Sequence, residues 1–194
     1  MLFFLIFGGS DLGPLAQVQA KYGKVKSLSA DFTESVTYSE GYQERFSGKM
    51  FVAEPGMIRL EASEPRRQLI VSDGKDAWLY MPEMNQALKQ PVAEISKACD
   101  PAIFLLNTPE DFSVSYTPQD NGHAFTFVPP EDGGYPYQKV VITLDDQLVI
   151  KGVSVVDLAG NIYAFSLSNV VLNPKFPEDM FSFTPPPGTE VFGQ

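Results

Sequence analysis

The sequence is poor in the side chains that most often carry metal and acid-base chemistry. Its 194 residues include a single cysteine, Cys99, and a single histidine, His123. One cysteine can form neither an internal disulfide nor a cysteine-based metal cluster, so we expect Cys99 to be a small buried or half-buried side chain. One histidine excludes His-rich zinc sites and makes any catalytic triad depend on His123, which lies in the polar turn 119–123. We expect no metal and no cofactor.

Basic charge and nucleotide-binding motifs are also scarce. The chain has 14 Lys and Arg against 24 Asp and Glu, a formal net charge of -10, which disfavours attraction to nucleic acid or to anionic lipid headgroups. No Gly-x-Gly-x-x-Gly follows a strand and no Gly-Lys-Ser/Thr loop is present. The adjacent acids at 131–132 and 145–146 lie in expected turns, where Asp is favoured by local hydrogen bonding. The sequence predicts neither a nucleic-acid-binding protein nor an enzyme.

The chain opens with a short apolar run, residues 1–7, followed by Gly8-Gly9-Ser10. This run is too short to span a bilayer and lacks a basic n-region, but it is typical of the later part of a secretory signal. We expect 1–10 to be a truncated signal remnant; the alternative is an apolar strand or a first helical turn. The remaining 11–194 suffice for a single domain with its own core.

Apolar residues recur at three- and four-residue spacing from Asp11 to Leu28 and predict one long amphipathic helix. Short apolar runs separated by turns then predict strands. Because their connections are short, successive strands are expected to be antiparallel neighbours. The expected strands are 30–38, 43–53, 57–62, 68–72, 76–80, 85–90, 112–117, 124–128, 138–144, 147–157, 161–172 and 181–183.

Two short helices are expected in the middle of the chain, over 92–98 and 101–107. Pro101 suits a first helical position. The second helix carries the unbroken apolar run 103–106, which one helical face cannot bury alone. This segment should therefore be covered by protein on several sides or overlie an apolar hollow.

The segment 68–86 reads as a β-hairpin whose Asp73-Gly74 turn supplies the required backbone freedom. Trp78, the only tryptophan, and Tyr80 point to one face of its second strand. Apolar alternation in this and other strands predicts one large apolar face. Either a solid core fills it, or it borders a cavity, because one helix and two helical turns are a thin cover for so many strands.

Several stretches are similar to one known family. Between Asp11 and Val191 the chain resembles the LolA family of periplasmic lipoprotein carriers. The most specific matches are the hairpin Val71-Ser72-Asp73-Gly74-Lys75 and the Phe-x-Phe-x-Pro-Pro-x-Gly ending from Phe181 to Gly188. Further matches are Val25 to Thr33, Gly48 to Met50, Trp78 to Tyr80 with Pro82, Asp100 to Leu106, and Asp157 with Gly160-Asn161.

The resemblance implies an α+β, mainly antiparallel fold: a half-open curved β-barrel of about eleven strands, with the long N-terminal helix and short helices as a lid over an apolar cavity. In that family the cavity takes lipoprotein acyl chains from an inner-membrane ABC transporter and delivers them to an outer-membrane receptor. It implies a periplasmic monomer that performs no covalent chemistry. The side chains expected to line the cavity are Ile58, Leu60, Ile70, Trp78, Tyr80, Leu105, Phe127 and Phe165, and the expected lid residues are Ile103, Phe104 and Leu106. Trp78 and Tyr80 are expected to face a space that is emptied and refilled.

One position departs from the family pattern. Glu54 precedes Pro55 where the family typically has an arginine thought to fasten the closed lid. Either apolar packing alone holds the lid, or the chain is a paralogue that carries another lipid or glycolipid. Two further hypotheses are a receptor that senses lipid or lipoprotein, and a lipid hydrolase that uses His123.

Overall fold

The computed structural model describes residues 13–91 and 111–193. They form one open sheet of twelve strands in the order β12-β6-β5-β4-β3-β2-β1-β11-β10-β9-β8-β7, together with one α-helix and one 3-10 turn. The predicted class, a mainly antiparallel open sheet with few helices, is confirmed. The elements are α1 (Leu15–Tyr22), β1 (Ser27–Thr37), β2 (Gln43–Ala53), β3 (Met57–Glu64), β4 (Gln68–Asp73), β5 (Asp76–Met81), η1 (Pro82–Met84), β6 (Gln86–Pro91), β7 (Ser113–Gln119), β8 (Gly122–Val128), β9 (Tyr137–Leu144), β10 (Ile150–Asp157), β11 (Ile162–Leu172) and β12 (Glu190–Gly193).

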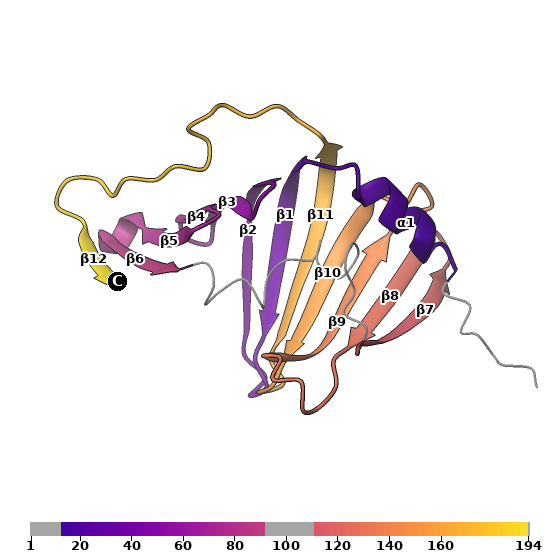
Figure 1. Cartoon of the computed structure of the whole chain (residues 1–194). Coiled ribbons are helices and arrows are strands. Elements are labelled where there is room, and N and C mark those ends of the chain that lie inside the picture. The colour runs from indigo at the N-terminus through magenta and orange to yellow at the C-terminus, as the bar shows by residue number, and fades with distance from the viewer. Residues whose placement is uncertain (1–12, 92–110, 194) are drawn as a thin grey trace, which may run out of the picture.

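The two faces of the sheet have different covers. Figure 1 shows α1 lying against the part of the sheet that contains β8 to β10. Val18 of α1 is fully buried there with Phe125 of β8 and Ile142 of β9, in a core that includes Val153. Since directly opposed residues share a face, the register extends this face from Val153 to Phe165. We call it the helix face.

On the opposite side, which we call the tail face, the segment 173–189 packs against strands β2, β3 and β5, and we call this segment the tail. Figure 1 shows it leaving the end of β11 and arching across to β12. Its Phe183 ring lies 5.6 Å from the Trp78 ring and 5.3 Å from the Tyr80 ring, centroid to centroid. The Arg59 guanidinium donates a hydrogen bond to the Met180 carbonyl at 3.2 Å. The tail then adds β12 to β6 in parallel, an exception to the expected antiparallel pairing.

The expected strand at 181–183 is wrong. These residues belong to the tail, where Phe181 is buried and Phe183 is half-buried by side-chain packing rather than by strand pairing. The following prolines at 185–187 have no N–H to donate to a ladder, so a strand cannot continue there. Pairing resumes only at Glu190, opposite Gln86 of β6.

The long helix expected over 11–28 is wrong in length, because α1 has only 8 residues. Gly23 follows it directly and disfavours a longer helix. From Ser27 onward the chain pairs with β2 on one side and β11 on the other. The hydrogen bonds that β1 forms with strands on both sides stabilise an extended structure here, although the apolar periodicity of the segment favours a helix.

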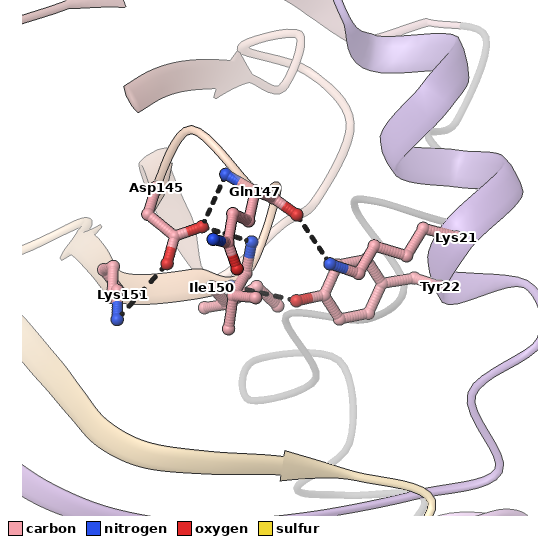
Figure 2. A network of polar contacts seen from close by, with 7 residues as sticks. Lys21, Tyr22, Asp145, Gln147, Ile150 and Lys151 are labelled. Carbon is pink, nitrogen blue, oxygen red and sulfur yellow. Dashed lines mark hydrogen bonds and ion pairs between the residues drawn. The ribbon is translucent and has the colours of Figure 1, made fainter. Parts of the chain in front are cut away.

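The C-terminal end of α1 is fastened to the turn between β9 and β10 (Figure 2). The Tyr22 hydroxyl accepts a hydrogen bond from the Ile150 N–H at 2.9 Å, and the Lys21 ammonium donates to the Gln147 carbonyl at 2.7 Å. Asp145 accepts the Gln147 N–H at 3.0 Å and so shapes the turn. Burial raises the pKa of Tyr22, which keeps its phenol neutral. A short helix is thereby fixed over the core.

The β4–β5 hairpin is confirmed, and its turn shows why Ser-Asp-Gly is needed. Gly74 has φ +90°, and an added Cβ would lie 2.5 Å from the Pro55 carbonyl oxygen, so only glycine fits. Asp73 accepts the N–H groups of Lys75 at 2.8 Å and Asp76 at 2.9 Å. These hydrogen bonds lower the pKa of Asp73.

Some predicted features lie outside the described residues. They are the signal remnant, the helices at 92–98 and 101–107, Cys99, Leu105 and the lid residues Ile103, Phe104 and Leu106. Within residues 13–91 and 111–193, no helix combines the length and hydropathy that a membrane span requires.

Candidate functional site

A row of opposed apolar side chains crosses six neighbouring strands on the helix face. The cross-strand pairs follow one another from β2 to β12, so each member lies opposite the member on the next strand and on the same face. We call this the apolar row. Its members are Met50, Leu60, Ile70, Leu79, Leu88 and Phe192.

The apolar row is incompletely buried. Ile70 is 37% exposed and Phe192 is 43% exposed, whereas Phe125 and Ile142 in the core under α1 are 0% exposed. Leu60 is only half-buried. Because removing apolar surface from water is favourable, a contiguous apolar surface of this kind is typical of a binding surface.

Five of the predicted cavity residues lie on the helix face. Ile58 and Leu60 come from β3, and Ile70 comes from β4. Phe127 is fully buried in the core with α1, so it is a packing residue in this structure. Phe165 joins that core to the second cluster formed by β1, β2 and β11. Ile58, Leu60 and Ile70 therefore form the group that lies in or beside the apolar row.

Trp78 and Tyr80 lie on the tail face, away from that group. Trp78 is opposite Val71, while Ile70 is opposite Leu79. Successive side chains of a strand point to opposite faces, so Trp78 cannot share a surface with Ile70. Both rings are half-buried against Phe183 of the tail. Trp78 and Tyr80 therefore do not border the apolar row, and the expectation that they face a space that is emptied and refilled stays a prediction.

Leu79 and Leu88 are site residues that the sequence analysis missed. Leu79 lies between Trp78 and Tyr80 in β5, and Leu88 is its cross-strand partner in β6. Strand alternation would have found them once Ile70 was placed on the helix face, because its partner Leu79 and then Leu88 follow from the register.

Polar and charged side chains lie at one end of the helix face, near β1 and β2. Glu44 accepts a hydrogen bond from the Tyr38 hydroxyl at 3.0 Å, and its carboxylate lies 3.7 Å from the Arg66 guanidinium. Arg66 lies over the Phe46 ring at 5.7 Å. Burial and the neighbouring Glu44 charge raise the pKa of Glu34. Acidic groups thus stand at one end of an otherwise apolar face.

Glu54 is engaged in a surface ion pair. Its carboxylate lies 2.6 Å from the Lys26 ammonium, and the two side chains are 52% and 70% exposed. An exposed pair of this kind contributes about 0 to 1 kcal/mol to stability. It links the β2–β3 turn to the segment between α1 and β1.

An open depression of about 490 Å³ lies mainly on the tail face of β1, β2 and β11. Its lining is polar and small, so it does not suit an acyl chain. It is lined by Thr33, Ser35, Gln43, Glu44, Arg45, Ala164 and Ser166.

The structure gives His123 a phenol as its neighbour. The Tyr116 hydroxyl lies 3.0 Å from its Nδ1, a pair that supplies neither the serine nor the acid of a triad. In the two described ranges, no group of three His, Cys, Asp or Glu side chains is placed to hold a metal ion.

The matching family model and the curated relatives of this chain share one description. The family model described as outer membrane lipoprotein carrier protein LolA matches residues 23–184. An outer-membrane lipoprotein carrier protein of Methylibium petroleiphilum is 28% identical, with 98% of this chain and 94% of the relative covered. One from Bordetella avium is 30% identical, with 92% and 87% covered. An uncharacterized conserved protein from Thermus thermophilus has a similar fold, with a TM-score of 0.57 at 12% identity, covering 92% of this chain and 96% of that one.

Proposed function

We propose that this chain, which belongs to the LolA family of outer-membrane lipoprotein carrier proteins, binds lipoprotein acyl chains on the helix face of its sheet. The observation that carries the proposal is the apolar row, which is partly exposed on that face, while the tail packs on the other side of the same strands. In this proposal the chain works in the periplasm, takes its cargo from an inner-membrane ABC transporter and gives it to an outer-membrane receptor. No covalent step is involved.

The dimensions of the apolar row suit an acyl chain. The six strands are separated by five inter-strand distances of about 4.8 Å each, so the row is roughly 24 Å long. One leaflet of a bilayer whose hydrocarbon core is about 30 Å thick has an acyl layer of roughly 15 Å. The row therefore offers enough length for an extended chain to lie across the strands.

Partial exposure of the apolar row also suits release. Full burial of an acyl chain contributes about 0.8 kcal/mol per CH₂, so several chains would exceed the practical limit of affinity near 20 kcal/mol. A surface that shields only part of each chain captures a fraction of that free energy. Cargo held in this way can be passed on.

The test introduces a charge into the apolar row. Ile70→Glu places a carboxylate where the acyl chain would lie, and we expect the variant to lose lipoprotein in a pull-down while its thermal unfolding is preserved, because Ile70 is already 37% exposed. The matched control is Ile162→Glu. Ile162 is 39% exposed but faces the tail side, since its neighbour Tyr163 is opposite Val36 on the helix face. Undiminished binding by Ile70→Glu, or equal loss in both variants, would refute the proposal.

A carrier of another lipid or glycolipid is the second candidate, favoured by one observation. Glu54, which stands in place of the family arginine, pairs with Lys26. Native mass spectrometry of protein purified from the periplasm separates the two candidates. Co-purified acylated peptide supports a lipoprotein carrier, whereas co-purified phospholipid or glycolipid alone supports the second candidate.

A further inference from the structure

Glu34 is an acidic residue among the apolar side chains of the helix face, at the end where Glu44 also lies. Its neighbours two residues away in β1, Phe32 and Val36, are 5% and 4% exposed. Its cross-strand partners are Phe46 of β2 and Phe165 of β11. Directly opposed residues share a face, so the Glu34 carboxyl stands between two phenyl rings on the face that carries the apolar row.

The charges around Glu34 leave it without a cation. On β2 its neighbour is the acidic Glu44, whose charge Arg66 already matches at 3.7 Å. On β11 its neighbour is the phenol of Tyr163, which in turn interacts with Asp157. Within the described part of the chain, no hydrogen bond or ion pair involves the Glu34 side chain.

A carboxylate among aromatic rings is costly unless something pairs with it. The protein supplies apolar contacts, aromatic faces and an anion here, but the cation is missing. Aromatic faces also attract organic cations. We propose that Glu34 receives an ammonium group of the cargo on the face that holds the acyl chains, about 13 Å along β2 from Met50 of the apolar row, because its partner Phe46 precedes Met50 by four residues. This inference rests on the function proposed above.

An ammonium group next to acyl chains has two sources. It can belong to the peptide part of a lipoprotein, as a lysine near the acylated residue, or to the headgroup of an aminophospholipid. Both present the same chemistry to Glu34. The experiment must therefore first establish the chemistry and then distinguish the sources.

The first measurement compares two amphiphiles with the same chain, dodecyltrimethylammonium and dodecyl maltoside, below their micelle concentrations by isothermal titration calorimetry. The native protein should bind the cationic amphiphile about tenfold more tightly. Glu34→Gln should abolish that preference and leave maltoside affinity unchanged. Glu131→Gln removes the same unit charge at an exposed loop position and should keep the preference. Salt at about 0.15 M screens the general attraction of the acidic chain for cations.

The outcomes separate this inference from the proposed function. If the native protein binds both amphiphiles equally, or if Glu34→Gln keeps the preference, the inference is wrong while the acyl-binding surface stands. If neither amphiphile binds, or if Ile70→Glu leaves maltoside binding intact, the proposed function itself fails. An equal loss of preference in Glu131→Gln would assign the effect to net charge and overturn the inference.

The second measurement repeats the comparison with natural chemistry. One pair is a diacylated lipopeptide with a free lysine and the same peptide with that lysine acetylated. The other pair is phosphatidylethanolamine and phosphatidylglycerol with matched chains. If the native protein prefers the ammonium-bearing member of one pair and Glu34→Gln loses that preference, this pair identifies the source of the ammonium group. No Glu34-dependent preference in either pair overturns the inference.

Discussion

The substitution Phe183→Ala tests whether the tail face contributes to stability without contributing to lipoprotein binding. The Phe183 ring is half-buried on the tail face and contacts Trp78 and Tyr80 at centroid distances of 5.6 and 5.3 Å. Truncating a fully buried Phe to Ala costs about 3 to 5 kcal/mol, and aromatic pairs add about 0.5 to 1.5 kcal/mol. For a half-buried ring with two aromatic neighbours we expect a loss of about 2 kcal/mol in the free energy of unfolding.

Two assays on the same Phe183→Ala sample check this expectation. For a chain of this size, about 2 kcal/mol corresponds to a fall in Tm of roughly 4 to 8 °C. Binding of lipoprotein in the pull-down, measured well below the Tm, should be unchanged because the apolar row lies on the other face. Ile70→Glu should show the reverse pattern, with stability kept and binding lost. Loss of binding in Phe183→Ala with unchanged stability would refute the assignment of the faces.

Two further predictions concern stability. Tyr22→Phe removes the acceptor of the Ile150 N–H and should lower the free energy of unfolding by about 1 to 3 kcal/mol in urea, and an unchanged midpoint would contradict the anchoring of α1. The pKa of Glu34 is raised above 4.5 in the folded state, so the ionised carboxylate destabilises the protein above the raised pKa, and this penalty disappears as the pH falls through it. Glu34→Gln should therefore be more stable than the native protein at pH 7, with a difference that narrows as the pH falls through the raised pKa and is lost below 4.5; a difference independent of pH would refute this explanation.

Strand positions were predictable because they depend on local patterns. The strand expected over 43–53 matches β2, and the turn at Asp73-Gly74 falls between β4 and β5 as expected. Apolar alternation and turn residues act over a few positions, so they are visible in the sequence. The antiparallel order from β1 to β6 follows from the short connections between those strands.

Helix length and the tail were not predictable from such patterns. The segment that follows Gly23 has helical periodicity, but pairing with two strands decides its structure. The β11 partner is more than a hundred residues away in the sequence, so no local pattern reports it. Phe181 and Phe183 alternate like a strand, yet the tail uses them as packing anchors.

The choice of face for the hairpin also required long-range information. Alternation showed that Trp78 and Tyr80 share a face, but either face of the hairpin could have lain on the side of the sheet that packs against α1 elsewhere. The size of the two rings does not decide between the faces. The register from Leu60 through Ile70 to Leu79 places the apolar row on the helix face, and the tail covers the aromatic side.

Photo-crosslinking tests the central claim most directly. A lipoprotein that carries a photoreactive group in its acyl chain is bound to the native protein and irradiated, and the modified residues are identified by mass spectrometry. The helix-face assignment predicts modification of Leu60, Ile70 and Leu79 in the apolar row. Modification confined to Trp78 and Tyr80 would contradict it.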